Sequence, residues 1–496
     1  MLLDAGRDRD VAERIFDICI IGAGPAGITL ARKLGARGLR VALMEAGGEG
    51  FDSASQDIYA GTNSGLDYWA LDFPRLRFFG GSSNHWAGWS RPLDAMDFEA
   101  RAHVPMSGWP FSKTELDTYA AETDTILELP ERADLPPLDQ LEPRFTRFQM
   151  RYSPPVLFGE KYREEISGSE NILCFFNANL VDLEVTGEGG RIAGARFRTL
   201  QNGDQGFLLR ARHFCLATGG IENARLLLNF DRQVTGGIGN QNGQVGRTFC
   251  EHPHFVIADM LLEADAPDLE FYRPTPEFAA SAGTLNFGLR LEPQRFNQPG
   301  APPREDIGSC EARLPQELRK VLGHAPSDRM RDFLNRSAAQ ACPTATLRIA
   351  FEQALNPESR VRLGSARDAL GLRRSDLHWQ LSDLDMHTMR AAAIAFGTHL
   401  AEQGRGRLRL RDWLTADPPD VPGIAADEVG GKHHMCTTRM SANPQEGVVD
   451  ADCRVHGVEN LFVAGSSVFP TGGHSNPTYT IIQLTLRLAD HLAGRI

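Results

Sequence analysis

The chain has 496 residues and a formal net charge of −12. This length exceeds what one ordinary hydrophobic core accommodates, so we expect two domains or one large domain with insertions. The acidic balance excludes non-specific nucleic-acid binding, which needs a basic surface. Hydrophobic residues make up 42% and charged residues 23% of the chain, which is typical of a folded soluble protein.

Neither the N-terminus nor the cysteines indicate export or metal binding. The first ten residues carry several charges and lack the apolar core of a signal peptide, and no run of 18 apolar residues predicts a membrane span. The eight cysteines are scattered without a C-x-x-C pair, which argues against a disulfide framework and a zinc site. We therefore expect a cytoplasmic protein with reduced thiols and no bound metal.

The N-terminal region has the pattern of a βαβ unit. Residues 16–21 form a short apolar run that ends at a glycine, as a buried parallel strand does. Residues 26–37 carry apolar side chains at helical spacing, and residues 39–45 predict a second strand. Together they span about thirty residues, the usual size of such a unit.

The rest of the chain alternates loops, strands and helices. Residues 50–110 are rich in Gly, Ser, Asn, Asp and aromatic residues, which predicts an extended functional loop region. The further predicted elements are strands within 191–217, a helix at 221–229, strands within 255–290 and 345–375, a long helix at 384–404, a buried strand at 460–464 and a helix at 478–494.

The segment Gly22-Ala23-Gly24-Pro25-Ala26-Gly27 joins the first strand to the first helix and matches G-x-G-x-x-G. Its first glycine permits the tight turn, its second lets the backbone approach a pyrophosphate, and its third lets helix and strand pack closely. Glu45 ends the second strand, where a carboxylate binds ribose hydroxyls. These features predict an adenine dinucleotide site, which FAD and NAD would both satisfy.

A second glycine-rich segment runs from Phe79 to Trp89. It places small residues around the pair His85-Trp86 and contains two tryptophans. Exposed loops seldom carry two tryptophans, so we favour a backbone wrapped closely around a planar ligand over a plain surface loop.

These motifs resemble those of the glucose–methanol–choline (GMC) oxidoreductases, and in particular a bacterial branch similar to pyranose oxidase. The matching segments occur in the family's order at both ends of the chain, whereas residues 266–414 match only loosely. The segments are Gly22–Gly27 with Glu45, Gly80–Gly88, Ala217–Arg225, His433–Met435, Asn460–Ser466 and Gly473–Thr478.

The resemblance implies an α/β fold (α+β overall) with two domains. A Rossmann-like FAD-binding domain would comprise residues 1–265 and 415–496, with a cofactor-covering loop region at about 52–110. Residues 266–414 would form a substrate-binding domain built on an antiparallel sheet that roofs the flavin. The catalytic residues would then lie at the domain junction, where ligand sites often occur.

The resemblance also implies which residues contact FAD. Val181 falls where family members contact adenine through the backbone, and the helix that starts at Thr478 can direct its N-terminus, with its positive dipole end, at reduced flavin. The predicted cofactor-binding residues are Gly22, Gly24, Pro25, Ala26, Gly27, Glu45, Gly80, Gly81, Ser82, Asn84, His85, Trp86, Ala87, Gly88, Val181, Ala217, Gly219, Asn223, Gly465, Asn476, Pro477 and Thr478.

His85 raises the question of a covalent bond. In the branch similar to pyranose oxidase, a histidine in the same His-Trp context bonds covalently to the flavin ring. Relatives with similar loops bind FAD without such a bond. We therefore favour non-covalent FAD and keep the covalent link through His85 as the alternative.

Oxidising an alcohol requires a base for the hydroxyl proton while the hydride passes to flavin N5, and a neutral imidazole suits the base. By resemblance His433 is this catalytic base, and Asn476 is the partner that holds the alcohol oxygen. His474 competes with Asn476 for the second role. His434 would face outward or support His433 from behind.

Three further residues leave alternatives open. Cys436 stands where the family usually has glycine, so it either narrows the site or is a small buried hydrophobe. His252 and His254, within Glu251-His252-Pro253-His254, could line the substrate cavity or form a metal pair, but no third ligand is suggested nearby. We expect a hydrogen-bonded structural role for them.

We therefore expect an FAD enzyme that oxidises a CH–OH group of a sugar, glycoside or related alcohol to a carbonyl. The alternatives are a biosynthetic tailoring enzyme acting on a non-sugar alcohol, a non-redox lyase or isomerase relative, and a dinucleotide-binding sensor without catalysis. Intact His433 and Asn476 argue against the sensor. Oxygen, a quinone or a redox protein could reoxidise the flavin, and the sequence does not indicate an oligomeric state.

Overall fold

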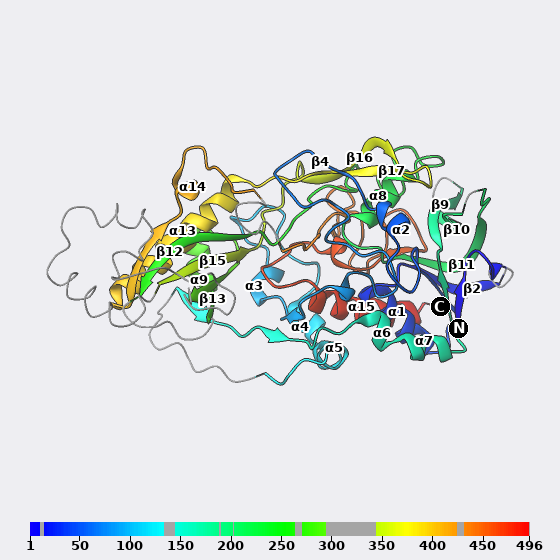
Figure 1. The fold of residues 1–496 in the computed structure, drawn as a ribbon, viewed down its shortest axis with the longest axis horizontal. Helices are drawn as coiled ribbons and strands as arrows, with labels where there is room; N and C mark the ends of the chain where they lie inside the picture. The colour runs from blue at the N-terminus through cyan, green and yellow to red at the C-terminus, as the bar shows by residue number, and fades with distance from the viewer. Residues whose placement is uncertain are drawn as a thin grey trace, which may run out of the picture.

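A computed structural model describes residues 1–9, 14–132, 144–187, 190–201, 203–262, 270–293, 344–423 and 431–495. The molecule is elongated, with a largely parallel sheet towards one end of its long axis and an antiparallel sheet at the other (Figure 1). Both chain termini lie at the end that carries the parallel sheet (Figure 1). Within the described ranges, no helix is both long and apolar enough to cross a bilayer.

The first sheet has eight strands, six of which run parallel to their neighbours, while β9 and β10 add an antiparallel edge. Its order is β1-β8-β3-β2-β11-β10-β9, and β19 also pairs with β11. The strands are β1 (Leu2–Asp4), β2 (Ile15–Ile21), β3 (Val41–Met44), β8 (Ile172–Phe176), β9 (Asn179–Thr186), β10 (Arg191–Arg198), β11 (Phe207–Leu216) and β19 (Leu461–Val463).

The sequence of β2 explains its central position. Six of its seven residues are buried, so the strand is covered on both faces, as a parallel strand between helices must be. The chain then turns into α1 (Pro25–Gly35), where a proline at the first helical position needs no N–H partner. The predicted βαβ unit of residues 16–45 is therefore confirmed.

The C-terminal segment returns to this unit. α15 (Thr478–Ala493) packs against α1, and β19 pairs with the end of β11. α8 (Glu222–Asn229) follows β11 in the same way that α1 follows β2. The first and last parts of the chain thus share one core, because the apolar faces of α1 and α15 bury each other.

The second sheet is antiparallel, in the order β18-β12-β15-β14-β13-β6. α13 (Asp383–Glu402) packs against β12 and β18, and a capping box between Ser382 and Asp385 starts it. The strands are β6 (Phe145–Arg147), β12 (His254–Leu262), β13 (Glu270–Pro274), β14 (Phe287–Pro293), β15 (Thr344–Phe351) and β18 (Gly406–Leu410). The expected fold class, a Rossmann-like α/β domain joined to an antiparallel sheet, is confirmed.

The division at residues 265/266 and 414/415 stays a prediction, and strand pairing suggests a refinement. β6 and β12 precede residue 266 yet belong to the antiparallel sheet. A small sheet of β16 (Arg360–Arg367), β17 (Arg373–His378) and β4 (Thr62–Asn63) packs through β16 and β17 on α8. We therefore propose a boundary near residue 253, with 360–378 assigned to the cofactor side. Residues 294–343 of the predicted substrate domain lie outside the described ranges.

The predicted loop region at 50–110 contains only short elements, as expected. The remaining elements of the described chain are α2 (Ser53–Asp57), η2 (Gly81–Asn84), β5 (Trp89–Ser90), α3 (Ala95–Phe98), α4 (Lys113–Asp117), α5 (Ala120–Ile126), β7 (Arg151–Tyr152), α6 (Phe158–Lys161), α7 (Arg163–Gly168), α9 (Pro276–Ala282), α14 (Asp412–Thr415) and η3 (Ser466–Val468).

Candidate active site

A cavity of about 680 Å³ lies at the carboxyl ends of the parallel strands. Residues that directly follow β2, β3, β11 and β19 line it, and His254 of β12 and Arg290 of β14 line it from the antiparallel sheet. Ligands of open α/β sheets bind at this edge, because loops and helix N-termini converge there.

The first and third glycines of the G-x-G-x-x-G segment are required by the backbone itself. Gly22 has a φ of +106°, and a Cβ on it would lie 2.5 Å from the carbonyl oxygen of Ala217. A Cβ on Gly27 would lie only 1.8 Å from the carbonyl oxygen of Gly22. These positions exclude any side chain, since the opposing atoms are backbone.

The second glycine of that segment serves the cavity instead. A Cβ on Gly24 would meet no protein atom within 4 Å, and the same holds for Gly219 and Gly465. All three line the cavity and come from the turns after β2, β11 and β19. At Gly24, Gly219 and Gly465 three backbone segments therefore leave an open surface, here called the glycine cradle, which side chains at these positions would block. The cradle fits a dinucleotide whose pyrophosphate and ring system approach the backbone closely.

Glu45 forms the predicted ribose end of this cradle. Its side chain is buried, and its two carboxylate oxygens accept the N–H groups of Ala23 and Gly47, each at 2.9 Å. Each oxygen keeps a second lone pair for a ribose hydroxyl. Ala178 and Leu180 line the cavity at the start of β9.

The segment Gly80–Gly88 lies directly against the glycine-rich turn. The N–H of Gly80 donates to the carbonyl of Ala23 at 2.9 Å, and a Cβ on Gly81 would come within 3.1 Å of the Cα of Gly24. Ser82, His85, Trp86, Ala87 and Gly88 line the cavity, as does Gly81. Burial lowers the pKa of His85. Its covalent link to flavin stays the less favoured prediction.

Five predicted cofactor residues lie outside the cavity wall: Gly27, Gly80, Asn84, Val181 and Asn223. Asn223 shows what such a residue does instead. Its side-chain oxygen accepts the N–H of Thr218 at 2.9 Å, and its amide donates to the carbonyl of Ala464 at 3.2 Å. It therefore ties the turn after β11 to the turn after β19. The other predicted cofactor residues line the cavity, and their binding roles stay predictions.

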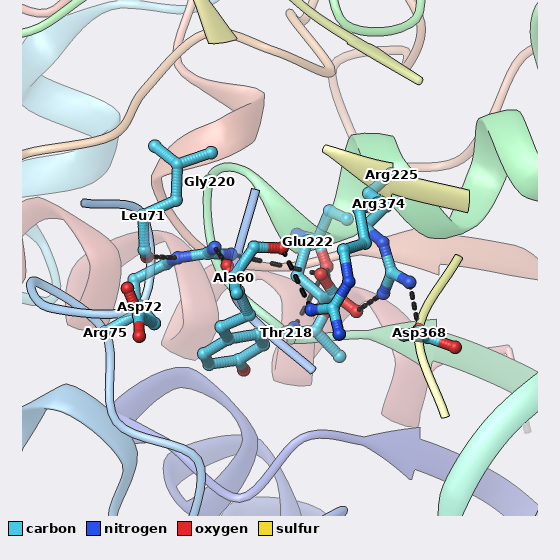
Figure 2. A network of polar contacts seen from close by, with 12 residues as sticks. Ala60, Leu71, Asp72, Arg75, Thr218, Gly220, Glu222, Arg225, Asp368 and Arg374 are labelled. Atoms are coloured by element: carbon cyan, nitrogen blue, oxygen red, sulfur yellow. Dashed lines mark hydrogen bonds and ion pairs between the residues drawn. The ribbon is translucent and has the colours of Figure 1, made fainter. Parts of the chain in front are cut away.

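A buried ionic cluster fixes the start of α8 beside the cavity (Figure 2). Arg225 donates to Glu222 at 2.7 Å and is also paired with Asp368, and all three side chains are at most 5% exposed. Arg75, from the loop region, lies 3.9 Å from Glu222 and donates to the carbonyl of Leu71. The cluster joins the loop region, α8 and the turn after β16, so the cavity wall there is held by charge pairs as well as apolar packing.

The predicted catalytic residues come together at the other end of the cavity. His433 and Asn476 both line it, and the Asn476 amide lies 3.3 Å from His433 Nε2. Asn476, Pro477 and Thr478 place the N-terminus of α15 at the same wall. The two residues are 43 positions apart in sequence and meet because the C-terminal segment returns to the first sheet.

The hydrogen bonds determine which ring nitrogens carry protons. His252 Nε2 lies 3.0 Å from the carbonyl oxygen of Gly472, which can only accept, so this nitrogen is the donor. Neutral His252 then accepts through Nδ1, which lies 3.0 Å from Nδ1 of His433. His433 therefore donates through Nδ1, and its Nε2 keeps a lone pair directed at Asn476.

The surroundings keep His433 uncharged. Burial, reinforced by the proximity of His252, His254, His434 and Lys432, holds the pKa of His433 well below its usual 6.5. Burial also lowers the pKa of His252 to about 4 and that of His254 to about 3. The histidines at this wall are therefore neutral near pH 7, and His433 is ready to accept a proton.

Glu251 holds the backbone beneath His433, the predicted base. Its buried carboxylate accepts the N–H groups of His433 at 2.7 Å, His252 at 2.8 Å and Gly431 at 3.2 Å, and it also accepts the hydroxyl of Tyr68. Burial outweighs these hydrogen bonds and raises the pKa of Glu251 to about 7. The sequence pattern did not single out Glu251 or Tyr68, because their partners lie far along the chain.

The structure places the histidines whose surroundings were left open. His434 does not face outward, because it is buried and its Nε2 lies 3.0 Å from the Tyr68 hydroxyl. His474 lies outside the cavity wall, 2.8 Å from Arg91 and 3.1 Å from Asp94, which favours Asn476 for the second role. His252 has the expected hydrogen-bonded role, whereas His254 lines the cavity.

Comparisons with known proteins identify the family of the chain. Residues 17–307 match the family model of FAD dependent oxidoreductases, and residues 356–485 match that of GMC oxidoreductases. The chain is 24% identical over 563 residues to the 6'''-hydroxyparomomycin C oxidase of Streptomyces lividus, covering 99% of this chain and 94% of that protein. It is 24% identical over 553 residues to the 2-methyl-1,2-propanediol dehydrogenase of Mycolicibacterium austroafricanum, covering 97% and 95%.

Solved structures show the same fold. The pyridoxine 4-oxidase from Mesorbium loti superposes with a TM-score of 0.56 at 17% identity, covering 96% of this chain and 99% of that one. The chain therefore belongs to the FAD-dependent oxidoreductases, and among these to the GMC oxidoreductases. The protein is therefore an FAD-dependent alcohol oxidoreductase, and its cofactor is FAD.

Substitution of Gly27 should lower the stability of the protein, whereas substitution of Gly24 should weaken FAD binding. Gly27→Ala forces a Cβ onto the carbonyl of Gly22, so we expect the apoprotein to lose about 3 kcal/mol or more of stability. Gly24→Ala adds a Cβ that meets no protein atom, so the apoprotein should melt within about 2 °C of the parent. FAD affinity of Gly24→Ala should nevertheless fall by about tenfold or more. Thermal unfolding and fluorescence titration with FAD measure both effects, and unchanged FAD affinity in Gly24→Ala would contradict the cradle.

Glu251 predicts a pH-dependent stability. The pKa of Glu251 is about 7 in the folded protein, above its ordinary value of 4.5. Protonated Glu251 therefore contributes fully to the stability of the folded state below pH 4.5, and this contribution is lost as the pH rises through about 7. Glu251→Gln removes this titration. The melting temperature of the parent minus that of the variant should therefore fall between about pH 5 and about pH 8. The exposed control Glu165→Gln should show a constant difference, and a constant difference for Glu251→Gln would refute the titration.

Proposed function

We propose that this enzyme oxidises a CH–OH group of a sugar, glycoside or related alcohol to a carbonyl, with His433 as the general base. The observation that carries the proposal is the chain of hydrogen bonds from Gly472 through His252 to His433. It leaves the lone pair of His433 Nε2 beside the Asn476 amide at the cavity wall. FAD bound in the glycine cradle would supply the hydride acceptor.

In this proposal His433 would remove the hydroxyl proton, and Asn476 would hold the alcohol oxygen. A substrate hydroxyl placed between His433 Nε2 and the Asn476 amide would lose its proton to His433 while Asn476 donates to its oxygen. His433 would share the gained charge through Nδ1–H with His252. The N-terminus of α15 at the same wall favours negative charge nearby. These groups suit removal of a hydroxyl proton as negative charge develops on oxygen.

The charges of the cavity wall support a neutral or anionic alcohol. Lys432 lines it next to His433, with its ammonium 4.5 Å from the Trp69 ring, and Arg290, which is ion-paired with Glu292, lines it from β14. The carboxylates among the described lining residues, Glu45 and Glu222, are already bound by backbone N–H groups and by Arg225. A substrate bearing an ammonium group would therefore meet like charge near the base. Sugars, glycosides and sugar acids fit this wall better.

The substrate class is tested with an artificial electron acceptor, with and without oxygen, against sugars, glycosides, sugar acids and amino sugars. Turnover of a neutral or acidic sugar with formation of its carbonyl is expected. Anaerobic bleaching of the flavin by the same compound distinguishes net oxidation from a lyase or isomerase reaction. Turnover restricted to non-sugar alcohols would support the tailoring alternative instead.

Removal of the base should separate binding from chemistry. His433→Ala should retain FAD and reduce it about 10²–10⁴ times more slowly in anaerobic single-turnover experiments, because one general base contributes about that factor. Asn476→Ala should slow the same step about tenfold to a hundredfold, which matches the loss of one buried hydrogen bond. His378 lies outside the cavity wall, so the control variant His378→Ala should reduce its flavin at the rate of the parent. An unchanged rate in His433→Ala would refute the assignment.

The pH dependence follows from the low pKa of His433. A base with a lowered pKa stays unprotonated as the solution becomes more acidic, so the rate of flavin reduction should stay constant down through the ordinary value of 6.5. The rate should fall only at lower pH. Stopped-flow flavin reduction with saturating substrate measures this profile, and a decline centred at or above 6.5 would contradict it.

A further inference from the structure

Two buried cysteines face each other behind the catalytic histidine. The sulfur atoms of Cys250 and Cys436 lie 2.7 Å apart, and both side chains are fully buried. Cys250 precedes Glu251 and His252, and Cys436 follows His433 by three residues. The pair therefore joins the two segments that position the base.

The backbone holds these two segments side by side. Cys250 and Met435 form an antiparallel bridge, in which Cys250 donates to the Met435 carbonyl at 3.2 Å and Met435 donates back at 3.1 Å. The hydroxyl of Thr248 donates to the Cys436 carbonyl at 3.0 Å, and the N–H of Cys436 donates to Ser466 at 3.1 Å. Three of these four hydrogen bonds join the segment of Cys250 to the segment of Cys436, so the backbones that carry the two sulfur atoms stay side by side while these bonds persist.

The conformation of Cys436 is a second, independent observation. Its φ is +67°, in the left-handed region that non-glycine residues seldom adopt. Glycine, the usual residue at this position in the resembling family, would fit that backbone without strain. Cys436 therefore has a backbone conformation that is unfavourable for cysteine, and its side chain lies directly opposite Cys250. The Cys436 side chain points to Cys250 and does not line the cavity. Cys436 therefore does not narrow the cavity.

We propose that Cys250 and Cys436 are a modification site, a thiol pair that is reversibly oxidised to an intrachain disulfide. In the oxidation each thiol loses its proton, the two sulfurs bond, and two electrons pass to a hydroperoxide. The O–O bond of the hydroperoxide breaks and its oxygens take up the protons, so that hydrogen peroxide releases two waters and an organic hydroperoxide releases one alcohol and one water. A dithiol reductant reverses the step. The proposal is independent of the substrate class and of the role of His433.

The disulfide would tie Glu251 and His252 covalently to the segment of His433. It would close a loop between residues 250 and 436, which restricts the unfolded chain and so stabilises the folded state. The geometry needs little change, because the bridge already aligns both segments. The oxidised enzyme should therefore resist heat better than the reduced enzyme.

The holoenzyme is incubated with hydrogen peroxide or with dithiothreitol, denatured in the presence of iodoacetamide, and mapped by mass spectrometry. A peptide linked through Cys250 and Cys436 is expected after peroxide and should be absent after dithiothreitol. Free thiols should fall by two from the eight of the chain. Alkylation of both cysteines after peroxide, or oxidation to separate sulfinic or sulfonic acids, would overturn the proposal.

The melting temperature supplies a second readout. Peroxide should raise it by about 5 °C in the parent, given the size of the closed loop. The rise should vanish in Cys250→Ala and in Cys436→Gly, the latter a residue that the backbone favours. It should persist in the control Cys174→Ala, which is equally buried in β8. A rise that survives in Cys436→Gly would also overturn the proposal.

Discussion

The buried carboxylate of Glu251 holds together the two chain segments that meet at His433, the proposed catalytic base. It accepts N–H groups from His252 on one segment and from Gly431 and His433 on the other, and the Tyr68 hydroxyl completes its surroundings. A buried carboxylate is costly unless it is hydrogen-bonded, so these partners stabilise it. The relative position of the His252 and His433 segments depends on these hydrogen bonds.

That register determines the chemistry of the imidazoles. Because His252 donates to Gly472, its other nitrogen must accept from His433, and the lone pair of His433 is left at the cavity wall. The low polarity of the site keeps these rings neutral, since burial is the largest cause of each lowered pKa. Neutral imidazoles suit the acceptance of a proton.

The cofactor end depends on a different constraint, which is the space that glycine leaves. Gly22 and Gly27 are glycine because backbone atoms stand where a Cβ would be, whereas Gly24, Gly219 and Gly465 leave their open sides to the cavity. The first group could be identified from one contiguous motif. The second comes from three separate turns. The family resemblance predicted all three as cofactor-binding residues, and the pairing of β2, β11 and β19 shows that their open sides lie along one edge of the sheet.

The sequence by itself determined the βαβ unit and the glycine-rich turn of a dinucleotide site, because these lie in local patterns. The choice of FAD over NAD and the candidates His433 and Asn476 came from the resemblance of its motifs to the GMC oxidoreductases. Only the tertiary structure decided that His434 is buried, that β12 belongs to the antiparallel sheet, and that His252 and Glu251 form hydrogen bonds with His433. The physical reason is distance along the chain. Glu251 and His433 are 182 residues apart, so no local periodicity records the hydrogen bond that joins them.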